Sequence, residues 1–342
     1  MMIKDNSLSA VTNLNSNYVF SEVEKESLFD LLSEIKENPY FNKYNFLQSI
    51  KNLAESVKTP KFFKELCKHA KQRNNTTEPF FYLKNIPNDK DRPIFDFDNP
   101  VTSKRNIKKS FIAEAFLALF TTLTDSELIT YKNDNNGDFF HDVYPMKQLS
   151  DTQSQKSLVS LGFHNDSSNH FARPEWLNML CMRNSSLNTV YTTFVKSIDI
   201  ISNLSDHTLN VLKQPQFDTP YDVLTKFGDE DAELDTTKKH SIINDDHNLI
   251  YFENRTTALN EEGEEAMKIL NAVIHKNKYS LQLEPDDLIS INNNKALHSR
   301  EIVSIKDPEA HKTRWSIKTY SVPSLDKYKH LFIEGEYGVI NG

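Results

Sequence analysis

The spacing of apolar residues changes along this chain, from mostly helical in the first 143 residues to mostly strand-like from residue 144 onward. Apolar residues recur at helical spacing in segments 21–35, 46–57, 61–73, 110–123 and 260–276. Short apolar or alternating runs, typical of strands, lie at 80–86, 158–163, 176–182, 190–195, 249–253 and 288–291. This order predicts an α+β fold with helices outside a double-sheet jelly roll.

Two helical segments carry further local signals. Ser21 precedes the first one, and Glu24 follows three positions later, which is the spacing of an N-terminal capping box. Segment 110–123, SFIAEAFLALFTTL, is the most apolar of the helices. We therefore expect it to be buried and to support the sheets.

The length of 342 residues is compatible with a single domain over 1–342. Residues 1–143 would form a mainly helical N-terminal support region, 144–322 the jelly-roll core, and 323–342 a C-terminal tail. Within the core, residues 214–248 are acidic and polar with little periodicity, which is typical of a lid or of a solvated insertion.

Composition excludes several classes of protein. The formal net charge of −8 argues against the basic patch of a nucleic-acid-binding protein. Cys67 and Cys181 are too few for a disulfide framework. The first twenty residues lack the apolar core of a secretory signal, and no later run is long enough to span a bilayer. We expect a cytoplasmic protein without a membrane partner.

The segment GFHNDSSN, residues 162–169, places His164 and Asp166 two residues apart. If this segment is a strand, both side chains point to the same face. A second histidine from elsewhere would complete the two-histidine, one-carboxylate set that suits Fe(II). On its own the pair is a weak signal, because a surface hydrogen bond between the two side chains also accounts for it. His298, in ALHSRE, is the candidate third ligand.

Several motifs in a fixed order carry a family resemblance: FHND, then WLNMLCMRN at 176–184, then Thr192–Thr193, ALHSRE at 296–301 and RWSIK at 314–318. In this order they resemble the clavaminate synthase-like branch of the Fe(II)/2-oxoglutarate-dependent oxygenases, over roughly residues 144–322. That branch includes hydroxylases of free arginine, asparagine and lysine. The resemblance implies a double-stranded β-helix core, of the jelly-roll or cupin-like kind, in a single catalytic domain.

The resemblance also implies roles for individual residues. His164, Asp166 and His298 would bind Fe(II), leaving two positions for 2-oxoglutarate and one for O2. Arg314 matches the cosubstrate arginine, and a guanidinium suits the distal carboxylate because it donates a planar pair of hydrogen bonds. One of Thr192 and Thr193 would add a hydroxyl, and we favour Thr192. Related halogenases lack the carboxylate ligand, so Asp166 favours hydroxylation, with desaturation as the other outcome.

Substrate contacts follow from the same resemblance. Lys318 stands four residues after Arg314, where the family has a second basic residue for the substrate carboxylate, and lysine lacks the guanidinium fork. Glu253 would meet the side-chain end of a basic amino acid, although an exposed strand-end carboxylate is an equal interpretation. Further acids lie in the expected lid at Asp229, Glu230 and Asp231. L-Lysine is the favoured substrate, with L-arginine and L-asparagine as alternatives.

Other interpretations stay open at this stage. A peptide-bound or carrier-bound residue would need an open groove, and a non-catalytic binding module would not bind iron. A homo-oligomer is compatible with the sequence. The remaining histidines without a partner at ligand spacing are expected to be non-ligands: His141, His170, His240, His247, His275 and His311.

Overall fold

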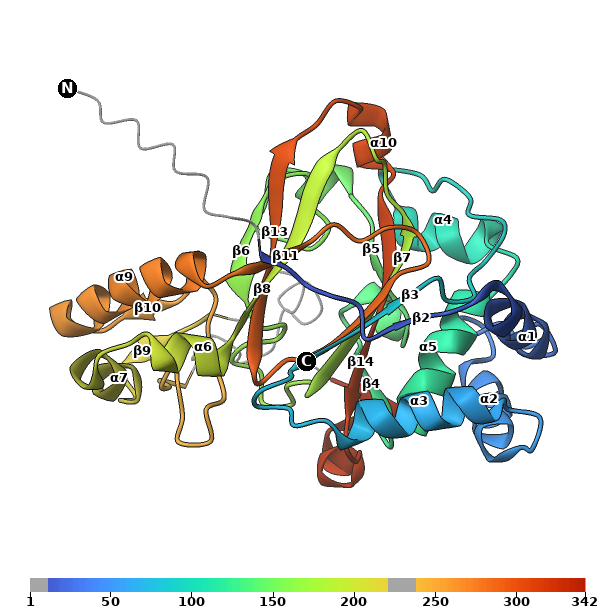
Figure 1. Ribbon diagram of the computed structural model, residues 1–342, viewed down its shortest axis with the longest axis horizontal. Coiled ribbons are helices and arrows are strands. Elements are labelled where there is room, and N and C mark those ends of the chain that lie inside the picture. Colours follow the sequence, from blue (N-terminus) through green and yellow to red (C-terminus); the bar gives the residue numbers. More distant parts are fainter. Residues whose placement is uncertain (1–11, 221–237, 342) are drawn as a thin grey trace.

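The computed structural model describes residues 12–220 and 238–341. Within these residues two larger β-sheets form the centre of the molecule (Figure 1). The five-stranded sheet has the order β1 (Thr12–Asn13), β11 (Tyr279–Leu281), β8 (Thr189–Lys196), β13 (Ala296–Ser304) and β6 (Leu161–His164). The nine-stranded sheet has the order β15 (Phe332–Ile333), β16 (Glu336–Ile340), β4 (Glu127–Tyr131), β14 (Trp315–Val322), β7 (Trp176–Arg183), β12 (Leu288–Asn292), β3 (Phe80–Lys84) and β2 (Tyr18–Val19), with β5 (His141–Val143) also paired to β14.

The two sheets share one apolar layer between them. Alternate side chains of each strand enter this layer, as strand geometry requires. In β3, Phe80 and Tyr82 face it, whereas Phe81 and Leu83 face the opposite side. Phe80 lies with its ring centroid 5.1 Å from that of Phe194 on β8, which belongs to the other sheet. The sheets therefore pack face to face, and polar residues at inward positions are held between them.

Helices cover the outer face of the nine-stranded sheet. They are α1 (Glu22–Leu32), α2 (Lys43–Glu55), α3 (Lys61–Gln72), α4 (Pro100–Ile107) and α5 (Ile112–Leu123). Each of α1, α2 and α3 packs against α5, whose residues Phe116 and Phe120 lie in the same cluster as Phe81 and Ile317 of the sheet. The buried helix predicted at 110–123 is thus confirmed.

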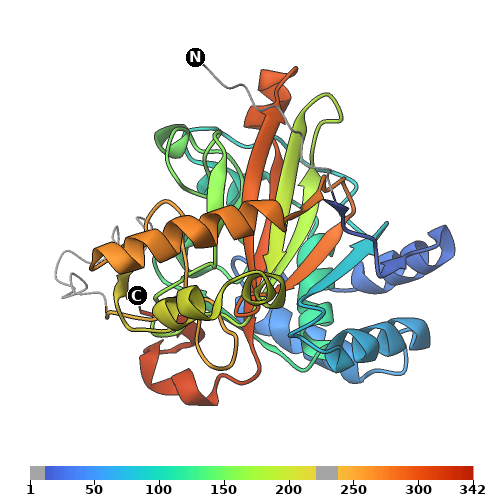
Figure 2. The same cartoon turned by 60° about the vertical axis from the view of Figure 1, so that its left-hand side comes forward.

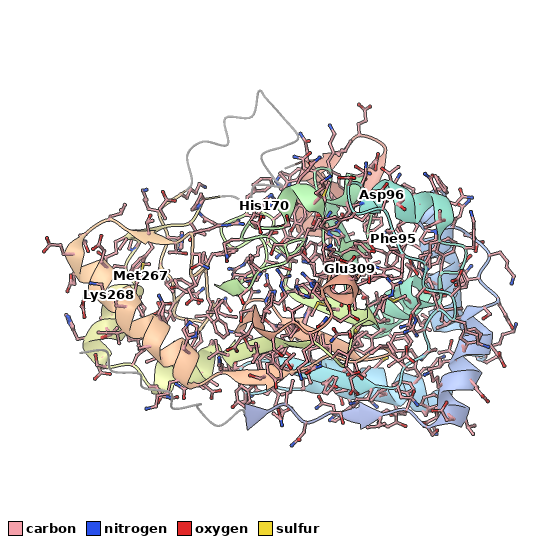
Figure 3. The ribbon with its side chains drawn as sticks, turned by 90° about the horizontal axis from the view of Figure 1, so that it is seen from above. Phe95, Asp96, His170, Met267, Lys268 and Glu309 are labelled. Carbon is pink, nitrogen blue, oxygen red and sulfur yellow. The ribbon has the colours of Figure 1, made fainter. Side chains whose placement is uncertain are left out.

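A second helical group covers the outer face of the five-stranded sheet. It contains α6 (Ser197–Ser202), α7 (Asp206–Leu212) and α9 (Glu261–Lys276), and Figure 2 shows α9 crossing in front of the strands. Leu212 and Ile274 pack with Val195 and Leu297, which point outward from β8 and β13. From above, α9 with Met267 lies at one end of the molecule, and the blue N-terminal helices lie at the other (Figure 3). The helices flank a two-sheet core, so the predicted α+β class is confirmed.

The predicted capping box at α1 is also confirmed, and it provides a stability test. Ser21 Oγ accepts a hydrogen bond from the Glu24 amide at 3.3 Å, and the Ser21 amide donates to Glu24 Oε2 at 2.9 Å. We expect Ser21→Ala to lower the free energy of unfolding by about 1 kcal/mol, measured by urea denaturation, because it removes the cap. Ser27→Ala, at an exposed position inside the same helix, is the matched control and should cost nothing. Equal losses for both variants would contradict the capping role.

Two expectations about segments need correction. Residues 249–253 form no named strand and make only the isolated bridges Leu249–Ile243 and Phe252–His164, since their backbone bonds to β6 only near His164. The segment from 323 onward is not a tail, since β16 pairs in parallel with β4. The mainly helical N-terminal region also supplies strands to the nine-stranded sheet: β3, which falls within the predicted strand at 80–86, and β4 and β5.

The expected lid at 214–248 is described only at its two ends. Phe217 is buried and exchanges backbone hydrogen bonds with His240, and it also lies in β9 (Phe217–Asp218), which pairs with β10 (Thr257–Ala258). Residues 221–237, including Asp229, Glu230 and Asp231, lie outside the described residues. No helix in the described ranges has the length and apolar character needed to cross a membrane.

Candidate active site

The three predicted metal ligands meet at the end of the five-stranded sheet. His164 is the last residue of β6, and His298 stands directly opposite it on the antiparallel strand β13. Asp166 Oδ1 lies 3.3 Å from His164 Nε2 and 3.7 Å from His298 Nε2. One ligand atom from each residue lies within 4.8 Å of the others, the one such group found among the described residues. Two imidazoles and one carboxylate on one side of an ion are the ligand set that non-haem Fe(II) takes.

The sequence placed Asp166 on the same strand as His164. This was wrong, although the three ligand atoms still converge. β6 ends at His164, and Asp166 lies in the turn that follows, where Ser167 has a φ of 51°. Asn293 fixes this turn, because the Asp166 amide donates to Asn293 Oδ1 at 2.9 Å and Asn293 Nδ2 donates to the Asp166 carbonyl at 2.9 Å. A tertiary contact therefore positions the carboxylate that the sequence assigned to a strand.

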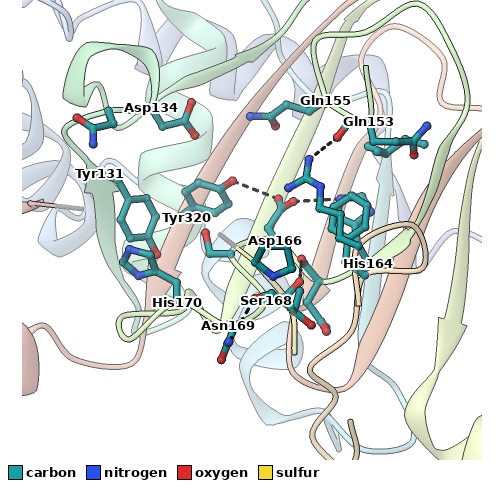
Figure 4. A pocket seen from close by; sticks show the side chains of 18 residues that line it. Tyr131, Asp134, Gln153, Gln155, His164, Asp166, Ser168, Asn169, His170 and Tyr320 are labelled. Carbon is teal, nitrogen blue, oxygen red and sulfur yellow. Dashed lines mark hydrogen bonds and ion pairs between the residues drawn. The ribbon is translucent and has the colours of Figure 1, made fainter. Parts of the chain in front are cut away.

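Hydrogen bonds orient the ligand atoms. His164 Nδ1 donates to the carbonyl of Gly162 at 2.9 Å, which leaves Nε2 as the acceptor nitrogen beside Asp166. Lys318 Nζ donates to the other carboxylate oxygen of Asp166 at 2.6 Å, and Tyr320 OH contacts the same oxygen at 3.3 Å. Figure 4 shows Asp166 between His164 and Tyr320. One oxygen of Asp166 is thus held by the protein and one is directed at the two imidazoles.

The protonation states suit a divalent cation. Burial alone would raise the pKa of Asp166, but the charge of Lys318 and the hydrogen bond with His164 hold that pKa well below its ordinary value. Burial, together with the neighbouring His164, lowers the pKa of His298 to about 3. A carboxylate beside a neutral imidazole is the form in which both residues ligate metal. The residues present therefore fit Fe(II).

A cavity rich in cations opens on one side of the three ligands. Thr192, Arg300, Arg314 and Lys318 line it together with His298. Arg314 donates through Nη2 to the Ser157 carbonyl, and its Nε has no hydrogen-bond partner in the described part of the chain. Burial lowers the pKa of Arg314 to about 10, so it stays charged near neutral pH. A buried guanidinium with a free donor fits a carboxylate ligand.

Arg300 was missed in the sequence, although it lies within ALHSRE two residues after His298. Its guanidinium is held by backbone carbonyls, among them Gln155 at 3.0 Å and Val159 at 2.8 Å. Burial and the neighbouring Arg314 lower its pKa well below the ordinary value. The sequence did contain a signal for Arg300: residues 298 and 300 of a strand point to the same face, so Arg300 could be expected beside His298. The two arginines make this end of the cavity strongly attractive to an anion.

The threonine pair is separated by the strand register. Arg300 stands opposite Thr192, and Ser299 stands opposite Thr193. Thr192 lines the cavity that contains Arg314. Thr193 is fully buried and shares a hydrogen bond with Ser299.

A second cavity adjoins the first, and its lining includes amides, aromatic rings and Arg255 (Figure 4). Gln155, Leu161, His164 and Asp166 line both cavities. Two carboxylates among the described residues line this second cavity, Asp166 and Asp134. Asp134 forms a hydrogen bond of 2.6 Å with His141 Nδ1. Neither Asp134 nor Gln155 had a signal in the sequence, because each comes from a loop that reaches the site only in three dimensions.

Glu253 does not line either cavity. Its Oε1 lies 2.6 Å from His275 Nε2 on α9, and its Oε2 accepts the Phe163 amide at 2.9 Å. This placement corrects the expectation that Glu253 faces the substrate: it ties α9 to β6. The histidines expected to be non-ligands lie apart from the metal group, and His170 lines the second cavity beside the ring of Tyr131.

Three candidate iron ligands, with a cationic cavity and a polar one beside them, are the arrangement expected of a non-haem Fe(II), 2-oxoglutarate-dependent oxygenase. The family model described as "Taurine catabolism dioxygenase TauD, TfdA family" matches residues 110–320. The chain belongs to this family, so the predicted enzyme class, with Fe(II) and 2-oxoglutarate as cofactor and cosubstrate, is confirmed.

Individual relatives narrow the likeness further. An L-asparagine oxygenase from Streptomyces coelicolor is 24% identical over 213 residues, which cover 61% of this chain and 62% of that protein. A solved asparagine oxygenase, in complex with Fe(II), 2S,3S-3-hydroxyasparagine and succinate, matches with a TM-score of 0.80 at 18% identity, covering 95% of this chain and 99% of that one. The non-haem iron oxygenase OrfP, in complex with Fe, succinate and (3S)-hydroxy-L-Arg, matches with a TM-score of 0.79 at 16% identity, covering 96% and 100%. These structures share the fold.

Proposed function

We propose that this protein hydroxylates an unactivated C–H bond of a free L-amino acid, converting 2-oxoglutarate to succinate and CO2. The single observation that carries this proposal is that two cavities of different chemistry adjoin at the iron ligands His164 and Asp166. One is lined by two buried arginines and suits a dicarboxylate. The other is lined by amides, Arg255 and Asp134, whose carboxylate contacts His141 and Asn135. We also propose that the two sheets form the double-stranded β-helix of the jelly-roll kind.

In the cationic cavity, Arg314 and Thr192 would bind the distal carboxylate of 2-oxoglutarate. Arg300 stays bound to carbonyls and adds positive charge. His164, Asp166 and His298 would hold Fe(II), which supplies the oxidative chemistry when it is bound. Lys318 keeps one oxygen of Asp166 engaged and would also attract a substrate carboxylate. The protein's part is to orient both small molecules and to exclude water.

Arginine and asparagine are the first candidate substrates, in place of lysine. The relatives named above carry hydroxyasparagine and hydroxyarginine in their sites. Lysine was favoured because lysine hydroxylases of the resembled branch have a similar helical N-terminal half. Glu253, the acid expected to meet lysine or arginine alike, is engaged by His275. Asp134 is the acid in the polar cavity, and we propose that it accepts hydrogen bonds from the nitrogen end of the substrate side chain.

The test is succinate formation from 2-oxoglutarate with Fe(II) and O2, across the twenty free L-amino acids, with product masses recorded. A gain of one oxygen on arginine or asparagine, matched to succinate, would support the proposal. Iron-dependent succinate formation that no free amino acid stimulates would reject a free substrate and direct attention to a peptide-bound or carrier-bound residue.

Arg314→Lys is expected to raise the KM for 2-oxoglutarate by about 10- to 100-fold, because lysine keeps the charge but loses the paired donors of the guanidinium. Arg105→Lys is the matched control, since Arg105 pairs with Asp138 outside both cavities. Initial rates of succinate formation against 2-oxoglutarate concentration measure the effect. An unchanged KM would remove Arg314 from the cosubstrate site.

Asp134→Asn is expected to lower kcat/KM for arginine by about 10- to 100-fold while changing that for asparagine by less than about threefold, because only the guanidinium needs a charged acceptor. Glu253→Gln is the matched control, because Glu253 lies outside the cavity. It should leave the ratio of kcat/KM for arginine to kcat/KM for asparagine unchanged. Equal losses for arginine and asparagine would contradict a role for Asp134 in selecting the side chain.

A further inference from the structure

A polar patch interrupts the apolar outer face of the nine-stranded sheet. Most of this face, for example Leu83, Leu180 and Ile317, packs under the N-terminal helices. Near one end of the strands, however, Ser290, Asn178 and Thr319 stand side by side on β12, β7 and β14, and Ser321 stands opposite Trp176 in the next row. Asn178, Ser290, Thr319 and Ser321 are all at least 97% buried. Burying polar groups at this depth calls for hydrogen-bond partners.

Four buried atoms around this patch have no partner within the described ranges. They are Arg73 Nη2, Asn75 Oδ1, Asn178 Oδ1 and Ser321 Oγ. All four residues line one pocket of about 180 Å³ between the sheet and the C-terminal ends of α3 and α5. Few buried polar groups in a protein lack a partner, so their convergence on one pocket points to a bound polar molecule. The pocket is larger than one water needs.

Arg73 supplies a fixed positive charge to the pocket. Its Nε donates to the Glu78 carbonyl at 3.1 Å and its Nη1 to the Ala70 carbonyl at 2.5 Å. The guanidinium lies 4.6 Å from the ring centroid of Trp176, which holds its plane in place. These contacts leave Nη2 as the donor directed at a ligand. At the rim, Lys71 and Asp125 pair with each other and are half-exposed or more, so the mouth of the pocket is polar.

We infer that this pocket is a second binding site, for a small zwitterion with the chemistry of a free α-amino acid. A carboxylate would accept hydrogen bonds from Arg73 Nη2 and Ser321 Oγ, and an ammonium group would donate to Asn178 Oδ1 and Asn75 Oδ1. A guanidinium selects carboxylate, and two amide oxygens select a donor. The inference does not depend on which substrate the iron site takes.

The site is separate from the iron centre although both use the same strands. On β14, Lys318 and Tyr320 point inward to Asp166, whereas Ser321 points outward to the pocket. On β7, Met179 lines the cosubstrate cavity and Asn178 the outer pocket. Alternate residues of one strand therefore face the two sites, so variants of one can be made without touching the other.

The experiment is equilibrium dialysis of the full-length protein against radiolabelled glycine, under anaerobic conditions with Fe(II) and 2-oxoglutarate present. Binding in the millimolar range or tighter is expected for the wild type. Arg73→Gln should weaken glycine binding at least about 10-fold. Ser321→Ala should weaken it by a smaller factor. Asp134→Asn, in the polar cavity beside the iron, is the matched control and should leave this binding intact.

Two further probes test the chemistry of the ligand. Acetate lacks the ammonium group and methylammonium lacks the carboxylate, and each should compete with glycine only weakly. Ser321→Ala removes a single hydroxyl, so it tests the site even where Arg73→Gln unfolds the protein. The inference would be overturned if the wild type bound no glycine, if Ser321→Ala and Arg73→Gln both bound it as tightly as the wild type, or if Asp134→Asn lost all binding.

Discussion

Replacing His164, Asp166 or His298 by alanine is expected to lower succinate formation from 2-oxoglutarate by more than about 100-fold, because residues that only orient metal ligands already contribute 10- to 100-fold. Each residue supplies one of the three ligand atoms that lie within 4.8 Å of one another. Removing one leaves a two-ligand site, in which an ion is held weakly and without fixed orientation. The measurement combines succinate formation with the iron content of the purified variants.

Asp166→Ala should differ from the two histidine variants in one respect. It also leaves Lys318 without the carboxylate it contacts at 2.6 Å, so a buried ammonium loses its charge partner. We therefore expect this variant to be the least stable of the three. His207→Ala, at an exposed histidine on α7, is the control and should retain full turnover. Wild-type turnover in any one of the three ligand variants would refute the assignment of the iron site.

Lys108→Met is expected to lower the free energy of unfolding by about 3–5 kcal/mol, the usual cost of removing one partner from a buried ion pair. Lys108 Nζ lies 2.9 Å from Asp89 Oδ2 and 2.7 Å from Glu114 Oε2, and all three side chains are fully buried. Without the ammonium, two carboxylates would remain buried beside each other. Denaturant unfolding monitored by far-UV circular dichroism measures the loss.

The effect should extend to the start of α5. Asp89 accepts hydrogen bonds from the amides of Ile112 and Ala113, so it caps this helix from a distant loop, and Lys108 holds it there. Lys109→Met is the matched control, because its side chain is exposed and contacts only the Asn106 carbonyl among the described groups. A loss below about 1 kcal/mol in Lys108→Met, similar to that of an exposed residue, would show that the buried network contributes little.

The sequence predicted most of the regular elements correctly, because they depend on local periodicity. Segment 61–73 became α3 and segment 260–276 became α9, with Asn260 accepting from the Gly263 amide as a cap. Ser21 formed its capping box within four residues of chain. Information of this kind lies within a few residues and needs no knowledge of the partner strand. The iron ligands were predicted in another way, from short motifs whose order along the chain resembles a known family, because the His164–Asp166 pair alone is a weak signal.

The residues that line the substrate cavity could not be predicted from local sequence patterns. Segment 249–253 has a strand-like pattern, yet the chain places Glu253 against His275, 22 residues further on. Asp134 and Gln155 enter the cavities from loops that reach the site only in the folded chain. The sequence by itself determined most of the helices and strands, since those signals are local, and it indicated the enzyme class and the iron ligands through motifs that resemble a known family. The tertiary structure alone decided which polar side chains point toward the ligands. The direction of a side chain depends on strand register and on contacts between residues more than a hundred positions apart in the chain.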